Sequence, residues 1–192
     1  LDAGMGTEDV ADAYKVVPDA QPWYSVVTLA DPDDLACDDI FYVVPGHNFG
    51  MASAVTNFNS VMEFMTFTLT SLLLVVTDHM FDDLPFVERA DFVADAQQAG
   101  ARYFALLGLP FSEDKSVPPG HFRKFLGVWT DLSKALSHGV MSLVADEDRL
   151  LDALEVIGGA RREGLLSPGA SLRLQGKLSF TLVSIMAKVG RT

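Results

Sequence analysis

The stretch LLLVVTDHMFDDLPFV, residues 72–87, decides the fold because it places an acidic pair between two apolar runs. Residues 72–76 and 84–87 are short, apolar and rich in branched side chains, which is typical of buried strands. Asp82 and Asp83 lie between the two runs, where the chain has to turn tightly. The pattern predicts a strand, an acidic turn and a second strand.

The segments on either side of this stretch alternate between strand and helix patterns. The expected elements are a hairpin of residues 23–30 and 40–44 with a turn at 31–34, helices at 49–72 and 90–107, a strand at 125–130, and helices at 146–163 and 167–189. This order predicts an α+β fold, in which an antiparallel sheet is covered on one face by two helices and a helical extension follows.

Composition limits the function classes. The chain of 192 residues carries a net charge of −12, which argues against simple nucleic-acid binding because a binder must neutralise phosphates. The charge is uneven, with 17 acidic and 2 basic residues in 1–100, but 1 acidic and 6 basic residues in 161–192. An acidic half that could hold metal ions is thus joined to a basic tail. The single cysteine, Cys37, excludes an internal disulfide and favours an intracellular location, in cytoplasm or nucleus.

One stretch has membrane-like composition. Residues 61–77 (VMEFMTFTLTSLLLVVT) are largely apolar, but they include Glu63 and are barely long enough to span a bilayer. A buried helix that runs into a buried strand is the preferred interpretation, so no membrane partner is expected. A small membrane-associated protein is the alternative. The histidines lack metal-ligand spacing and are expected in loops or at the surface; they are His47, His79, His121 and His138.

Two acidic residues carry the candidate chemistry. Asp9 ends a short apolar segment and opens the string DVADAYKVVP, residues 9–18, and Asp82 lies at the expected hairpin turn. If the two strands are neighbours, these carboxylates face one another at one edge of the sheet. Phosphoryl transfer commonly uses two Mg²⁺ ions about 3.5–4 Å apart, which are held by such oxygen ligands and stabilise the attacking and leaving oxygens. A bland acidic hairpin is the alternative, since the chain has further Asp-Asp pairs at 33–34 and 38–39 that are expected in solvated turns or loops.

The string at residues 9–18 resembles the first catalytic motif of reverse transcriptases. Four further strings resemble the later motifs of that family in the same order: FGMASA with NFN at 49–59, FDDL at 81–84, LLGL with EDKS at 106–116, and FLGV of the primer-grip hairpin at 125–128. Together the five motifs cover about 120 residues. LSPG at 166–169 and LQGKLSF at 174–180 are similar to the region after the polymerase core in DIRS-like, tyrosine-recombinase retrotransposons.

The resemblance implies a polymerase palm at 1–131 and a helical connection or thumb-like segment at 132–192. It implies RNA-directed DNA synthesis with two Mg²⁺ ions, for which Mn²⁺ can substitute. The implied partners are an RNA or DNA template with its primer, deoxynucleoside triphosphates and an adjoining ribonuclease H-like domain.

The resemblance also assigns residue roles, here grouped by function. The catalytic residues are Asp9, Asp82, Asp83 and Lys115; the metal ligands are Asp9, Val10 (by its carbonyl), Asp82 and Asp83; the nucleotide pocket has Val10, Ala13, Tyr14, Phe49 and Gly50; and the primer grip has Phe125, Leu126 and Gly127. Tyr14 corresponds to the steric gate against a 2′-hydroxyl, and Lys115 to the donor that protonates pyrophosphate. Ordinary structural roles for Tyr14 and Lys115 stay open.

His47-Asn48-Phe49 replaces the Pro-Gln or Pro-Phe that more commonly precedes the glycine, and two further features depart from the family pattern. Met80 stands where many members have Tyr, and no fingers region, which supplies basic residues for the triphosphate, precedes Asp9. These departures leave a second hypothesis open, in which the chain is a decayed or domesticated retroelement fragment that acts as a non-catalytic nucleic-acid-binding or structural module.

Overall fold

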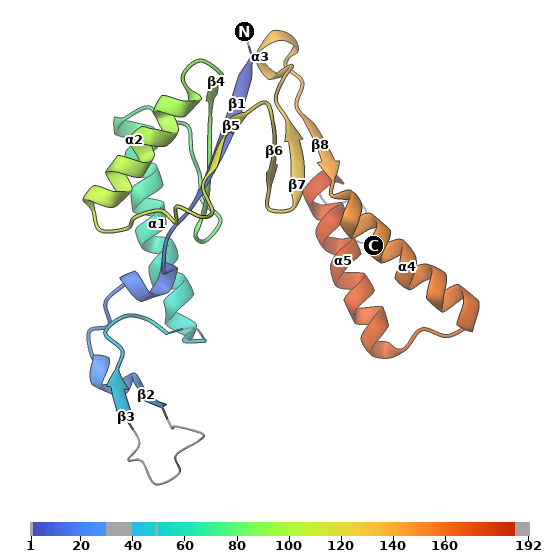
Figure 1. Ribbon diagram of the computed structural model, residues 1–192, viewed down its shortest axis with the longest axis horizontal. Coiled ribbons are helices and arrows are strands. Elements are labelled where there is room, and N and C mark those ends of the chain that lie inside the picture. Colours follow the sequence, from blue (N-terminus) through green and yellow to red (C-terminus); the bar gives the residue numbers. More distant parts are fainter. Residues whose placement is uncertain (1, 30–39, 49, 187–192) are drawn as a thin grey trace. The chain divides into compact units, whose positions relative to one another are not determined.

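The computed structural model describes residues 2–29, 40–48 and 50–186. It divides the chain into two compact units, Gly6–Pro118 and Leu1–Met5 with Pro119–Thr192 (Figure 1). Both units combine helices with small sheets, so the expected α+β class is confirmed. The boundary between the two compact units lies at residues 118–119. The boundary expected at residue 131 was drawn between a palm and a connection, and it stays a prediction.

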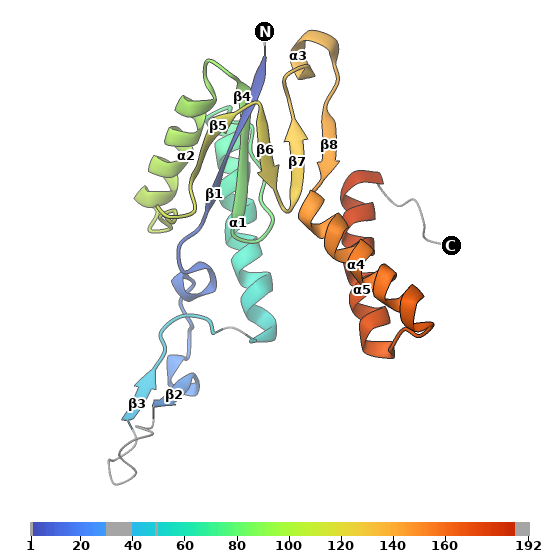
Figure 2. The same ribbon diagram turned by 45° about the vertical axis from the view of Figure 1, so that its right-hand side comes forward.

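A three-stranded sheet has the order β4-β1-β5, with β1 at Ala3–Asp9, β4 at Asp83–Arg89 and β5 at Val117–Gly120 (Figure 2). All seven residues of β1 are buried, as expected for the central strand of a covered sheet. Its sequence, AGMGTED, has few β-branched residues. Its strand state therefore comes from its central position and not from local propensity.

Two helices pack on one face of β4. They are α1, Ala52–Leu72, and α2, Val93–Leu106 (Figure 1). Leu84 and Phe86 are two residues apart on β4, so they point to the same side, and both belong to the core cluster. The helical members of that cluster are Phe58, Met62, Met65 and Leu69 from α1, and Phe104 from α2. The spacing of the α1 residues follows the helical repeat, which explains why α1 was predictable.

The strand expected at residues 72–76 is wrong. Leu72 is the last residue of α1, and the N–H groups of Leu73 and Val75 both donate to the Leu69 carbonyl, at 3.1 Å each. Leu74 has a φ of 55°, so the helix closes on a left-handed residue where the strand was expected. The chain returns beside β4 through isolated antiparallel bridges only, Thr77 to Phe86 and Met80 to Asp83.

The expected hairpin between the first acidic string and α1 is confirmed over its described residues. Strands β2, Val26–Leu29, and β3, Ile40–Val43, pair antiparallel in four consecutive pairs. Residues 23 and 24, expected in the first strand, belong instead to the short helix η2, Pro22–Tyr24. The turn expected at residues 31–34 and the Asp-Asp pairs at 33–34 and 38–39 lie outside the described residues.

The second unit contains a sheet of order β6-β7-β8 and three helices. Their bounds are β6 Phe122–Phe125, β7 Val128–Asp131, α3 Ala135–His138, β8 Ser142–Ala145, α4 Glu147–Glu163 and α5 Pro168–Met186. The two long helices match the expected ranges as far as residue 186, and the Ser167 hydroxyl caps α5 by accepting a hydrogen bond from the Ala170 N–H.

The single strand expected at residues 125–130 is wrong. Leu126 and Gly127 have φ values of 48° and 75°, and they form a tight turn between β6 and β7. Two successive positive φ angles are typical of a two-residue hairpin turn. Among the helices that the structure describes, none is both long enough and apolar enough to cross a membrane.

Candidate active site

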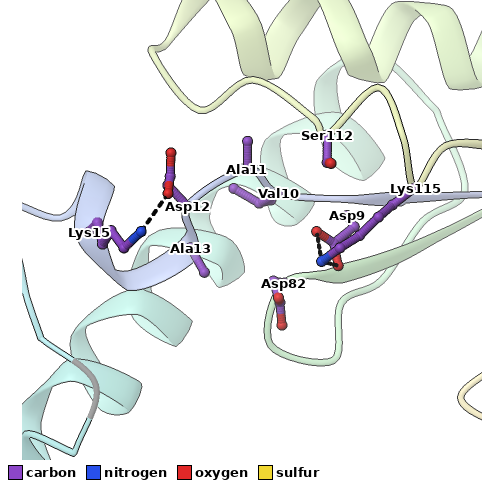
Figure 3. Close-up of a pocket in the computed structure, with 9 residues that line it drawn as sticks. All are labelled: Asp9, Val10, Ala11, Asp12, Ala13, Lys15, Asp82, Ser112 and Lys115. Carbon is purple, nitrogen blue, oxygen red and sulfur yellow. Dashed lines mark hydrogen bonds and ion pairs between the residues drawn. The ribbon is translucent and has the colours of Figure 1, made fainter.

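Asp9 and Asp82 line one pocket of about 360 Å³ (Figure 3). Asp9 is the last residue of β1, and its side chain is largely buried. The Val10 N–H donates a 2.9 Å hydrogen bond to the Asp82 carbonyl, which brings the end of β1 against the acidic turn. Residues 73 positions apart in the sequence thereby line the same pocket.

The acidic turn is tight and strained. The Met80 N–H donates to the Asp83 carbonyl at 2.9 Å, and the Asp83 N–H donates back to the Met80 carbonyl at 3.2 Å, so only Phe81 and Asp82 occupy the turn. Phe81 has a φ of 57°, a conformation that costs a bulky non-glycine residue about 1–2 kcal/mol. The strain sits next to Asp82, and strained backbone occurs preferentially at functional sites.

Lys115 is bound to Asp9. Its Nζ donates to both carboxylate oxygens, at 2.8 and 2.9 Å (Figure 3). The segment that carries it is fixed by backbone bonds, from the Ser112 N–H to the Asp9 carbonyl and from the Lys115 N–H to the Ser112 carbonyl. The hydrogen bond to Asp9, and then attraction to that charge, raise the pKa of Lys115, so this ammonium stays charged at neutral pH.

The acidic residues repel one another. Burial is the largest cause that raises the pKa of Asp83, followed by repulsion from Asp82 and Asp9, while Lys115 acts in the opposite direction. Carboxylate oxygens in mutual repulsion are chemically suited to a hard divalent cation such as Mg²⁺, which would relieve it. In the described part of the chain, however, no group of three or more His, Cys, Asp or Glu is gathered closely enough to hold a metal ion.

The structure brings together part of the expected residue set. The expected residues that line the pocket are Asp9, Val10, Ala13, Asp82 and Lys115, and Ala11, Asp12, Lys15 and Ser112 line it with them. Asp83, Tyr14 and Gly50 are not among its lining residues, and Phe49 lies outside the described residues.

Tyr14 and Gly50 have structural roles of their own. Tyr14, on the short helix η1 (Ala13–Val16), packs edge-on against Phe58 with ring centroids 5.2 Å apart, at the margin of the core. Gly50 precedes α1 with a φ of 91°, which strongly favours glycine. The residues expected to grip the primer, Phe125, Leu126 and Gly127, form the β6–β7 turn in the other unit.

Sequence reasoning missed a buried polar cluster directly beside Asp9. Glu8 is 6% exposed, and one of its carboxylate oxygens accepts hydrogen bonds from Gln97 Nε2 at 2.5 Å and from the Ser116 hydroxyl at 2.9 Å. The signal in the sequence was the pair Glu8-Asp9 at the end of a strand, since successive strand residues point to opposite faces. One of the two acids therefore had to point under the sheet.

The histidines lie in loops or at the surface, as expected, but one of them is buried. His47 lies in a loop, as expected, but its side chain is buried, only 6% exposed, with Nε2 3.3 Å from the Asn57 side-chain nitrogen. The adjacent Gly46 packs so tightly on the backbone of Lys15 that a side chain at position 46 would collide there. His121 and His138 are exposed, whereas the His79 side chain is only 10% exposed.

No protein-family model and no curated protein matches this chain.

Proposed function

We propose that this chain is the palm and connection of a reverse transcriptase, which copies an RNA or DNA template into DNA. One observation carries the proposal: Asp9 and Asp82, from two different motifs, line a single pocket. A shared pocket is what nucleotidyl transfer requires of two carboxylates that come from separate strands, because both must reach the same ions.

The arrangement of elements supports the finer fold assignment. A polymerase palm has an antiparallel sheet with two helices on one face. Here α1 and α2 share a core with one face of β4, and the acidic turn immediately precedes that strand. We assign residues 1–131 to the palm and 132–192 to a helical connection or thumb-like segment. On this proposal the β6–β7 turn at Leu126-Gly127 holds the primer end.

The proposed reaction assigns a role to each residue of the site. Asp9 and Asp82 would hold two Mg²⁺ ions, or Mn²⁺ in their place, with Asp83 and the Val10 carbonyl nearby. The ions would activate the primer 3′-hydroxyl and neutralise the leaving pyrophosphate. As the resemblance implies, Lys115 would protonate the leaving pyrophosphate, and Tyr14 would select against a ribose 2′-hydroxyl. The substrates would be deoxynucleoside triphosphates and a primed template in an intracellular retroelement, beside a ribonuclease H-like domain.

Primer extension tests the proposal. The polypeptide that carries this segment is incubated with a primed template and deoxynucleoside triphosphates, with Mg²⁺ present or removed by a chelator. We expect extension that depends on Mg²⁺. In parallel, binding of Mn²⁺ to the 192-residue chain is followed by electron paramagnetic resonance, and Asp82→Asn should weaken it. Template copying that persists without any divalent ion would contradict the proposal.

A second candidate function is favoured by the contact between Lys115 and Asp9. The ammonium occupies both oxygens of the carboxylate that would hold the ions, which is an arrangement that also suits a domesticated, non-catalytic nucleic-acid-binding or structural module. Nucleic-acid binding that is unchanged by Mg²⁺, together with no extension, would favour this second function.

A further inference from the structure

Glu8 is a buried acid with a specific set of partners. Asp9, at the end of β1, lines the pocket. Glu8 precedes it in the same strand, so its side chain points to the opposite face of the sheet. Glu8 does not line the pocket, so it cannot contact a substrate there. Its described hydrogen bonds go to Gln97 and Ser116.

Two adjacent acids therefore contact two adjacent residues of the facing segment. Asp9 binds Lys115, and Glu8 binds Ser116, the residue directly before β5. The two contacts lie on opposite faces of β1. A backbone held on one side by Ser116 has little freedom to turn, so the neighbouring lysine leaves the chain in a fixed direction, toward Asp9.

Gln97 of α2 connects Glu8 to the start of β5. Its Nε2 donates to Glu8 at 2.5 Å and to the Val117 carbonyl at 3.1 Å, and two acceptors on one nitrogen define the orientation of the amide. Gly6, two residues before Glu8 on the same face, makes room for it, because a Cβ at position 6 would lie 2.1 Å from Gln97 Oε1. The cluster thus joins α2, β1 and the start of β5.

We propose that Glu8 is a positioning residue, which holds the Lys115 ammonium on the Asp9 carboxylate by anchoring Ser116. Lys115 needs such an anchor because its side chain is 61% exposed, and long exposed lysines lose much conformational entropy when they are fixed. The anchoring does not depend on the proposed polymerase function, and only a catalytic role for Lys115 would rest on it.

Lysine acylation tests the anchor without any activity assay. The folded 192-residue chain is pulsed with an acetyl N-hydroxysuccinimide ester, and acetylation of each lysine is followed by peptide mass spectrometry. An amine held in two hydrogen bonds reacts more slowly than a free one. Ser116→Ala should speed acetylation of Lys115 by about fivefold, the factor that corresponds to one net hydrogen bond. Lys15, which pairs with Asp12 at 2.8 Å in the same pocket, serves as the internal control and should not change.

Two variants of Glu8 complete the test. Glu8→Gln retains an acceptor oxygen for Ser116 and should restore the wild-type rate at Lys115, while Glu8→Leu should resemble Ser116→Ala. Unchanged Lys115 acetylation in folded Ser116→Ala would overturn the proposal, and so would equal acceleration at Lys15, which indicates general loosening. If Glu8→Leu does not fold, Ser116→Ala decides. Failure of the wild-type polypeptide to extend a primer would refute the proposed polymerase function but would leave the acetylation result intact.

Discussion

The backbone N–H of Val10 donates a 2.9 Å hydrogen bond to the backbone carbonyl of Asp82. This single contact closes the end of β1 onto the acidic turn, so the relative position of the Asp9 and Asp82 carboxylates does not depend on flexible side chains alone. Because backbone atoms make the contact, side-chain substitutions at Asp9 and Asp82 can be interpreted as changes in the pocket's charge and ligands, with the framework retained.

Asp82→Asn should abolish primer extension in the polypeptide that carries this segment. The amide keeps the size of the side chain but removes a negative metal ligand, and loss of several kcal/mol of transition-state stabilisation lowers the rate about a thousandfold or more. Initial rates on a primed template measure the effect. Asp91→Asn, an equal change of charge on an exposed residue paired with Arg89, is the control and should extend normally. Extension by Asp82→Asn at the rate of Asp91→Asn would remove Asp82 from the catalytic set.

Tyr14→Ala should have two separable effects. Loss of the ring that packs against Phe58 should lower the free energy of unfolding by about 1–3 kcal/mol, because the position is only partly buried. Loss of the proposed steric gate should also admit ribonucleotides. Thermal unfolding and incorporation of ribonucleoside triphosphates measure the two effects. Tyr14→Phe keeps the ring and should retain both stability and sugar selectivity. Destabilisation with unchanged selectivity would leave Tyr14 as a core residue only.

Asp83→Asn should raise the melting temperature at pH 7. The pKa of Asp83 is raised in the fold by burial and by repulsion from Asp82 and Asp9, so the folded state holds the proton more tightly than the unfolded chain. The stability that this provides is present below the ordinary value of 3.8 and is lost as the pH rises through the raised pKa. The gain from Asp83→Asn should therefore be present at pH 7 and disappear near pH 3.

Thermal unfolding at the two pH values measures this difference. Asp91→Asn again provides the control, since Asp91 is exposed and pairs with Arg89 at 3.5 Å, and its substitution should give no gain at pH 7. A gain for Asp83→Asn that is as large at pH 3 as at pH 7 would contradict an electrostatic cause.

Parts of this architecture could be predicted from the sequence because local patterns determine them. The apolar spacing of Phe58, Met62, Met65 and Leu69 predicts α1, and the apolar run after Asp83 predicts β4. The sequence pattern also indicates a turn at Asp82, since an acidic pair between apolar runs has to reach solvent.

Other parts depend on contacts that no local pattern contains. β1 lies between β4 and β5 and is buried along its whole length, although its residues have weak strand propensity. Leu74 ends α1 in a left-handed conformation that nothing about a leucine indicates. In the candidate site, the partnership of Glu8 with Gln97 spans 89 residues and requires the packed helix. The turn at Leu126-Gly127, by contrast, agrees with the hairpin that the resemblance implies at residues 125–128, and glycine there favours positive φ.

Gly100 and Gly176 should respond in opposite ways to alanine. Both lie inside helices, α2 and α5, where alanine gains about 1 kcal/mol of helix propensity over glycine. A Cβ at Gly100 would lie 2.3 Å from the Phe86 ring in the core, whereas a Cβ at Gly176 meets nothing within 4 Å. Gly100→Ala must displace a buried ring and should lower the free energy of unfolding by about 1–3 kcal/mol. Gly176→Ala should raise it by up to about 1 kcal/mol.

Denaturant unfolding of the two variants, followed by circular dichroism, measures this contrast between close packing and intrinsic propensity. Gly100→Ser adds a similar volume and should destabilise at least as much, which tests whether collision is the cause. Equal stabilisation by Gly100→Ala and Gly176→Ala would mean that α2 does not pack against β4 at Phe86. The helix-covered sheet that places Asp82 beside Asp9 would then lose its structural basis, because the same core residues, Leu84 and Phe86, fix β4 beneath the acidic turn.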